Sequence, residues 1–261
     1  MSVNLPALLA AEDSANRSRL RPGRHRSGLR DCTAMSPRTR QFFQQQLDAV
    51  EEELQNHARL VMRALDRAMQ ALLAGDEQLA DMVIAEDDEN DATYARIEDG
   101  VVRLLALQTP LATDLRLILA MLHINLHLER MGDQCVNIAK LTKLTLNLMI
   151  ASELLESFQK MGEQAEAMTE EAMTAFAERN AKRGERLVTM DSTINSENRN
   201  IARRIMALGG DEQTREAGLH AIIISRCLER IGDNAVDIGE RVAYLVSGEF
   251  REFTDASHPD E

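Results

Sequence analysis

An eleven-residue motif occurs twice in this chain and constrains its fold more than any other feature. The first copy is LERMGDQCVNI at residues 128–138, and the second is LERIGDNAVDI at residues 228–238. Because self-similarity at a fixed spacing is typical of repeated folds, the two copies predict two similar structural units in tandem.

The similarity extends beyond the motif into the segments that precede it. At an offset of 104 residues, Ala68 and Met69 fall on Ala172 and Met173, and Asp87 falls on Asp191; the offset then shortens to 100 at the motif. Apolar residues follow a helical period throughout, which predicts an all-α fold of two tandem three-helix bundles. Six long helices are expected, at about residues 37–74, 76–108, 110–149, 152–180, 181–208 and 211–247.

The composition agrees with few and long helices. Aromatic residues make up only 3% of the chain, and five prolines and 13 glycines leave little to interrupt a helix. The predicted organisation is a disordered, Arg-rich N-terminal arm at 1–37, a first bundle at 38–150, a second bundle at 151–248 and a frayed C-terminal tail at 249–261.

Charge and hydropathy exclude several classes of protein. A net charge of −13 argues against nucleic acid as a partner, because binding to phosphates needs a basic surface. The longest uncharged stretch, residues 117–128, is well short of the roughly 20 residues that span a bilayer, so no membrane insertion is expected. The three cysteines, Cys32, Cys135 and Cys227, lack paired or metal-type spacing and indicate small apolar residues in a reducing compartment.

Each copy of the motif carries two acidic residues four positions apart. Glu129 pairs with Asp133, and Glu229 pairs with Asp233. On a helix this spacing places both carboxylates on one face, and the helical wheel turns that face away from the apolar stripe. Like charges in this position repel each other, which is a reason to expect a cation beside them.

The preceding helices carry a second set of acidic residues. Asp87 and Asp91 are also four apart, whereas in the second repeat Asp191 is matched by Asn195. If consecutive helices pack antiparallel, the two sets converge on one outer face of each bundle. Oxygen ligands without histidine or thiol suit a hard ion such as Mg²⁺, Ca²⁺, Mn²⁺ or iron.

Two glycines in the motif predict a close helix contact beside these acids. Gly132 and Gly232 lie between the apolar stripe and the carboxylates, where a missing side chain lets a neighbouring helix approach. A simpler interpretation of the acid pairs is a solvated surface, with Arg130 and Arg230 neutralising them through weak surface ion pairs.

Other chemistry finds little support in the sequence. His123 and His127 have a spacing compatible with zinc, but the second repeat has no counterpart, so they are expected to be interface or partly buried residues. The chain has no Gly-rich phosphate loop, dinucleotide fingerprint or nucleophile motif, and we therefore expect no enzymatic activity.

Taken together, these residues resemble a known family. The two LER-M/I-GD motifs, the acidic run EDDEND at 86–91 and the segment QTPLATDLR at 108–116 are similar to those of the PhoU family of phosphate transport regulators. The resemblance covers about residues 38–248. It departs at Asn195, where a carboxylate would complete a pair, and at Asn137, where the second repeat has Asp237.

The resemblance implies a function as well as a fold. It implies a cytoplasmic, homodimeric adaptor that contacts the ATPase of the phosphate ABC transporter and the phosphate sensor histidine kinase, and that restrains phosphate uptake and starvation signalling. It also implies that divalent or trivalent metal ions bind on the outer face of each bundle. The residues implicated are Glu129, Asp133, Glu229, Asp233, Asp87, Asp91, Asp191 and Asp237.

Two further functions remain as alternatives. A carboxylate-bridged di-iron enzyme in a helical bundle requires Glu-x-x-His motifs that project into the core, and this chain has no such set. The other alternative is a purely structural helical scaffold that binds no metal.

Overall fold

The computed structural model describes residues 37–107, 110, 112–207 and 211–253. In this part of the chain the regular structure is helical, and residues Arg38–Glu261 belong to one compact unit. The predicted arm at 1–37 lies, except for Pro37, outside the described residues, as does the tail from residue 254 onward. The helices are α1 (Pro37–Ala74), α2 (Glu77–Ala85), α3 (Asp87–Leu107), α4 (Ala112–Thr145), α5 (Ser152–Glu178), α6 (Ala181–Ala207) and α7 (Glu212–Ser247).

The six predicted helices are present, but the second is interrupted. It forms two segments, α2 and α3, which meet at Glu86. Asp87, Asp88 and Glu89 occupy the first turn of α3, and acidic side chains there stabilise the positive end of a helix, so this run favours a new helix start. An ion pair between Glu86 and Arg67 of α1 holds the break in place. The expectation of one continuous helix at 76–108 was therefore wrong.

Local residues explain where the other helices begin and end. Gly75 follows α1 with a φ of +64°, a left-handed conformation that glycine adopts without strain. Asp76 then accepts a hydrogen bond from the backbone N–H of Leu79 at 3.0 Å and caps α2. Asp211 caps α7 in the same way, through the N–H of Thr214 at 3.0 Å. The last helix thus starts close to residue 211, as expected from the sequence.

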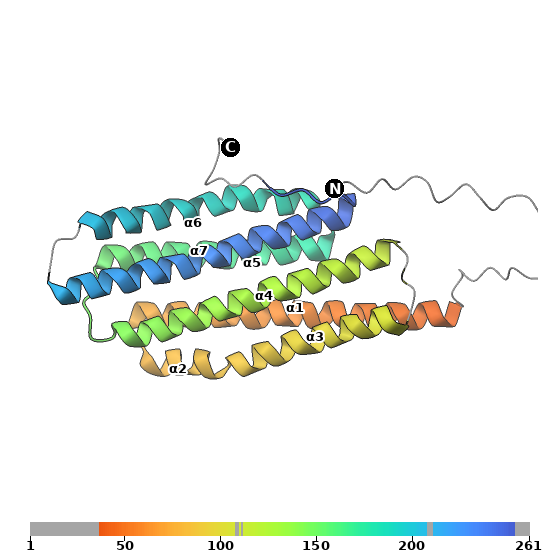
Figure 1. Ribbon diagram of the computed structural model, residues 1–261, viewed down its shortest axis with the longest axis horizontal. Coiled ribbons are helices and arrows are strands. Elements are labelled where there is room, and N and C mark those ends of the chain that lie inside the picture. The colour runs from red at the N-terminus through yellow and green to blue at the C-terminus, as the bar shows by residue number, and fades with distance from the viewer. Residues whose placement is uncertain (1–36, 108–109, 111, 208–210, 254–261) are drawn as a thin grey trace, which may run out of the picture. The chain divides into compact units, whose positions relative to one another are not determined.

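The helices form two groups that follow the sequence repeat (Figure 1). α2 and α3 pack against α4 in the first group, and α5, α6 and α7 pack against one another in the second. Contacts between α4 and α7 join the groups. The core is mostly aliphatic, with methionines and three phenylalanines. Its largest fully buried side chains are Phe43, Phe158, Phe176, Leu54, Leu65, Ile97, Leu104, Ile118, Met121, Ile124, Leu128 and Met131.

Close helix crossings depend on glycine, as expected for Gly132 and Gly232. A Cβ on Gly132 would collide with the side chain of Asn90 on α3, and a Cβ on Gly232 would lie 2.9 Å from Oδ1 of Asp191 on α6. The closest crossing was not anticipated. A Cβ on Gly184 of α6 would lie 2.7 Å from the backbone oxygen of Gly239 on α7, so here backbone packs against backbone.

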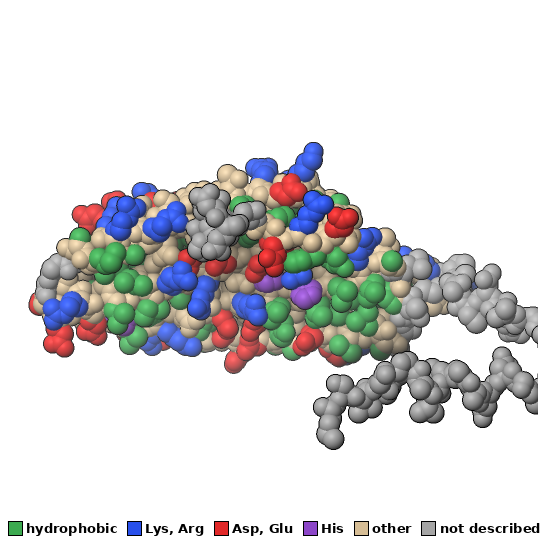
Figure 2. All heavy atoms as spheres, turned by 45° about the horizontal axis from the view of Figure 1, so that its top comes forward, with side chains coloured by type: hydrophobic (Ala, Val, Ile, Leu, Met, Phe, Trp, Pro, Cys, Tyr) green, Lys and Arg blue, Asp and Glu red, His purple; other side chains and the backbone are tan. Residues whose placement is uncertain are grey.

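The surface mixes charged and apolar side chains. Figure 2 shows hydrophobic side chains gathered in patches between charged ones on one face of the molecule. Two of the most exposed large apolar residues are Leu144 at 61% and Leu219 at 58%, on α4 and α7. No helix in the described ranges combines the length and apolarity needed to cross a membrane.

Residues 249–253 lie against the end of α7. The N–H of Phe253 donates to Oε1 of Glu240 at 2.6 Å, and the ring of Phe250 meets Tyr244 edge to face. The guanidinium of Arg241 stacks over the same Phe250 ring. The first residues of the predicted tail are thus ordered against the second bundle.

Candidate functional site

The structure brings the predicted acidic residues of the first repeat into one group, here called acid group 1. Asp87 and Asp91 lie on the first two turns of α3, and Glu129 and Asp133 lie on α4. The two helices pack together, and the crossing at Gly132 brings their acidic edges close. The convergence predicted from the sequence is therefore present in the first repeat.

The negative charges of this group act on two of its members, Asp87 and Glu129. Burial raises the pKa of Asp87, and the negative charges of Asp91 and Asp133 raise it further. Burial also raises the pKa of Glu129, with Asp133, Asp91 and Asp87 adding to the effect. A raised carboxylate pKa means that the local environment disfavours the charged form, which is the condition that a bound cation relieves.

One oxygen of acid group 1 has no hydrogen-bond partner. Oδ1 of Asp87 is buried and accepts no hydrogen bond from the described residues. Beside it lies a small cavity of about 20 Å³, lined in part by Glu86, Asn90 and Gly132. An unsatisfied buried acceptor costs roughly 1–3 kcal/mol, and a hard cation is one group that can satisfy it. The donor set of acid group 1 therefore fits such an ion.

The second repeat forms acid group 2 from Asp191 on α6 and Glu229, Asp233 and Asp237 on α7. Burial raises the pKa of Asp233 to about 7, and the charges of Glu229, Asp191 and Asp237 contribute. The side chain of Asp233 is nevertheless open to solvent on one side. Ionising this carboxylate is unfavourable chiefly because burial withholds water from it, and the three neighbouring acidic residues add to the cost.

Amide and guanidinium groups already occupy much of acid group 2. Asn195 donates a hydrogen bond to Oδ2 of Asp191, and Asn198 donates to Oε1 of Glu229 at 2.9 Å. Arg226 forms an ion pair with the same Glu229. These contacts reduce the negative charge available to an ion, so the two groups are not chemically equivalent.

Two of the acidic residues are less exposed than the helical wheel predicts. Glu229 is 9% exposed and Asp191 is 5% exposed, although their carboxylates were expected on an outer face. The reason is the close approach of α6 to α7 at Gly232, which covers the edge of the acidic face. Asp91, Asp133 and Asp233 are exposed, as expected.

Asp237 has a second environment, between the two bundles. Its Oδ2 lies 3.4 Å from Nδ1 of His127 on α4, and the same nitrogen lies 2.9 Å from Oδ1 of Asn234. His127 is buried at this contact of α4 with α7, which confirms its expected role as an interface residue. Burial lowers the pKa of His127, so its neutral form is favoured.

No site is already closed around a metal. Across the ranges that the structure describes, no three histidine, cysteine, aspartate or glutamate side chains are arranged closely enough to hold an ion. Binding of an ion would therefore require acidic side chains to move closer together, and several of them are exposed. Cys135 and Cys227 are buried free thiols on α4 and α7, consistent with the prediction from their spacing.

A buried polar network in the first bundle was not anticipated from the sequence. His57 of α1 places Nδ1 2.8 Å from Oδ1 of Asn125 and Nε2 2.9 Å from Oδ1 of Asn90. Asn125 donates to the backbone oxygen of Tyr94 at 3.0 Å. The network links α1, α3 and α4 directly beneath acid group 1, because Asn90 also packs on Gly132. The sequence feature that could have indicated this network is His57, a histidine at a position where the helical period of the first helix calls for an apolar residue.

The fold and the acid groups define a class of protein: an all-helical protein with a repeated three-helix unit, each unit carrying acidic residues on its last two helices. The model of the PhoU domain family matches the chain twice, at residues 54–142 and 158–242. The chain belongs to the PhoU family.

Individual relatives agree with this assignment. A phosphate-specific transport system accessory protein PhoU homolog from Clostridium acetobutylicum is 30% identical over 212 residues, covering 80% of this chain and 96% of the relative. A homolog of the same name from Pseudomonas aeruginosa is 32% identical over 222 residues, covering 84% and 88%.

Solved structures show the same fold. The crystal structure of PhoU from Pseudomonas aeruginosa has a TM-score of 0.74 at 31% identity, and covers 79% of this chain and all of that one. The phosphate transport system regulatory protein PhoU from Streptococcus pneumoniae also has a TM-score of 0.74, at 28% identity, and covers 80% of this chain and 99% of its own.

Proposed function

We propose that this protein is a cytoplasmic regulator of phosphate transport that catalyses no reaction. In this proposal it contacts the ATPase subunit of the phosphate ABC transporter and the phosphate sensor histidine kinase, and it restrains uptake and starvation signalling when phosphate is ample. The observation that carries the proposal is the double match to the PhoU domain, together with relatives named as phosphate-specific transport system accessory proteins.

An adaptor of this kind works by differential binding. It shifts the kinase or the ATPase between two states only as far as it binds one state better than the other. A preference of about 1.4 kcal/mol changes the ratio of the two states tenfold, so one modest interface suffices. We further propose that the protein acts as a homodimer.

Recovery of partners tests the regulatory role directly. The tagged full-length chain, captured from phosphate-replete cells, is expected to retain the transporter ATPase, the sensor kinase or both. The same capture from phosphate-starved cells is the matched comparison. Absence of both proteins under both conditions would contradict the proposed function, whatever the metal content of the chain.

We also propose that the acid groups bind iron, Mn²⁺, Mg²⁺ or Ca²⁺. Asp87, Asp91, Glu129 and Asp133 would hold an ion in the first repeat, and Asp191, Glu229, Asp233 and Asp237 in the second. A bound cation would neutralise the carboxylates and connect consecutive helices. The amide contacts of Asp191 and Glu229 and the ion pair of Glu229 with Arg226 support tighter binding at acid group 1, whose carboxylates have fewer such partners.

Thermal unfolding with added Mn²⁺ or iron tests this proposal. An ion that binds only the folded protein raises the unfolding temperature by mass action. The variant Asp133→Asn is expected to remove most of the increase, and Asp233→Asn to remove a smaller part. An unchanged unfolding temperature in the parent, with no metal in gently purified protein, would favour the alternative of a structural scaffold.

A further inference from the structure

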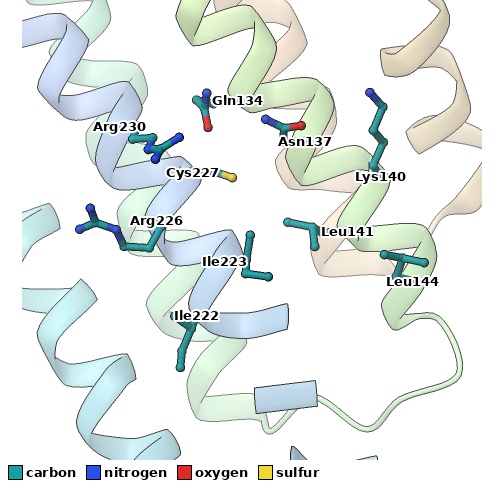
Figure 3. Close-up of a pocket in the computed structure, with 10 residues that line it drawn as sticks. All are labelled: Gln134, Asn137, Lys140, Leu141, Leu144, Ile222, Ile223, Arg226, Cys227 and Arg230. Atoms are coloured by element: carbon teal, nitrogen blue, oxygen red, sulfur yellow. The ribbon is translucent and has the colours of Figure 1, made fainter. Parts of the chain in front are cut away.

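A groove lined by none of the acid-group residues runs between α4 and α7. Its volume is about 480 Å³, and residues from both helices line it. Figure 3 shows Leu141 and Ile223 extending toward each other from the two helices, with the sulfur of Cys227 turned into the same space. This part of the groove is apolar.

The other end of the groove is polar and basic. Lys140 of α4 and Arg230 of α7 belong to its lining, with the amides of Gln134 and Asn137 between them (Figure 3). Both cations are exposed, and no ion pair holds either of them in the described part of the chain. A third lining cation, Arg226, is already paired with Glu229.

This charge pattern contrasts with the rest of the protein. The chain has 43 acidic and 30 basic residues, yet the lining includes three cations and no carboxylate. The apolar end is also unusually open, since Leu144 is 61% exposed and Ile223 is 41% exposed. One turn before Ile223, Leu219 extends this apolar surface along α7 at 58% exposure. Exposed apolar side chains beside unpaired charges are typical of a binding surface.

We propose that the groove between α4 and α7 binds an acidic amphipathic helix of a partner protein. The lining extends along α4 from Gln134 to Leu144, which corresponds to roughly 15 Å or three helical turns. A helix in the groove would place apolar residues over Leu141, Leu144 and Ile223, and carboxylates beside Lys140 and Arg230. Helices bind grooves of other proteins in this manner through residues spaced three and four apart.

The basic end of the groove favours an acidic helix over other occupants. The chain's own residues 17–30 carry six arginines, which the basic end of the groove would repel. A small anion would satisfy Lys140 and Arg230 but leave the apolar end uncovered. This inference goes beyond the proposed function, because the groove is lined by different side chains from those of the acid groups and needs no metal.

A designed peptide tests the proposal on the full-length protein. The probe is a fluorescently labelled helical peptide with leucines along one face and glutamates at one end of that face. Binding is measured by fluorescence anisotropy. The double variant Lys140→Glu/Arg230→Glu is expected to bind it at least tenfold more weakly, and a peptide with lysines in place of glutamates is expected to recover binding to that variant.

The control variant is Lys160→Glu/Lys182→Glu, which makes the same change in charge on α5 and α6 and should leave the affinity unchanged. Because the chain contains no tryptophan, Leu144→Trp adds a single reporter. Its emission is expected to shift to shorter wavelength when the acidic peptide binds, since the indole becomes covered.

Three results would overturn the proposal. In the first, the groove variant and the control variant bind the peptide equally well. In the second, inorganic phosphate at constant ionic strength displaces the peptide, and changing the peptide's leucines to alanine has no effect, which would identify an anion site. In the third, the groove variant loses self-association in sedimentation while its peptide affinity is unchanged, which would identify a contact between copies of this chain.

Discussion

The carboxylate of Asp233 in acid group 2 has a strongly raised pKa. Its pKa is raised to about 7 in the folded chain, against about 3.9 for an unperturbed aspartate. The folded state therefore binds more protons than the unfolded state between these values. By linkage, the contribution of Asp233 to stability falls as pH rises from about 4 to about 7.

Replacing Asp233 with asparagine should remove this loss. In metal-free buffer we expect Asp233→Asn to leave stability nearly unchanged at pH 4 and to raise it by about 1–2 kcal/mol at pH 8. Three pKa units correspond to roughly 4 kcal/mol, but solvent screens a carboxylate that is open on one side. Urea unfolding at both pH values measures the difference, with Glu185→Gln on the exposed face of α6 as the control. An equal effect of Asp233→Asn at both pH values would show that ionising Asp233 does not destabilise the folded state.

Single residues were predictable where the helical period decided their position. The spacing of Glu129 and Asp133 placed both on one edge of α4, and the structure joins them to Asp87 and Asp91. The hydrogen bond that Glu229 accepts was not predictable, because its donor Asn198 is 31 residues away and reaches it only after the helices pack. A polar partner of this kind leaves no local pattern in the sequence.

The crossing of α6 and α7 is an element-level feature that rests on two glycines. At Gly184 and Gly239 the helix backbones touch, and a side chain has no room on either helix. We expect Gly239→Ala to destabilise the protein by about 1–3 kcal/mol, because overpacking outweighs the better helix propensity of alanine.

Chemical denaturation measures this effect, and Thr193→Ala on the exposed face of α6 is the matched control. The control improves helix propensity without adding a contact, so it should be neutral or slightly stabilising. If Gly239→Ala changes stability no more than the control does, the close approach of α6 and α7 does not contribute to stability.

Helix ends were predictable where capping residues mark them, and less so elsewhere. Gly75 with Asp76, and Asp211 before α7, fix their boundaries through local hydrogen bonds. The break at Glu86 was missed because the run of acids after it was interpreted only as a possible ligand set. The same acids also favour a helix start. Asp87 is therefore both a candidate ligand and the first residue of α3.

On the scale of the whole molecule, several contacts connect the two repeats. Arg179 donates to Glu51 at 2.6 Å, and Met69 of α1 fills the space beside Gly162 of α5. The packing of α4 on α7 adds a buried surface. Because each repeat covers apolar surface of the other, we expect the two repeats to unfold in one cooperative transition.

The chain provides its own reporters for this prediction, since it has two tyrosines and no tryptophan. Tyr94 lies on α3 in the first repeat, and Tyr244 lies on α7 in the second. In urea, the tyrosine fluorescence of Tyr94→Phe and of Tyr244→Phe should follow the loss of helix in each variant with the same midpoint. Two separated midpoints in either variant would show that the repeats unfold independently.

The short helix α2 gives the first repeat a local weak point. Nine residues are too few for a helix to be stable alone in water, so α2 depends on its aspartate cap and on packing against α4. Its amide protons should therefore exchange with solvent through local opening rather than global unfolding. Because Asp87 begins the helix that follows, any ligand that fixes Asp87 also slows this opening. Amide exchange in α2 would then report on occupancy at a carboxylate outside α2 itself.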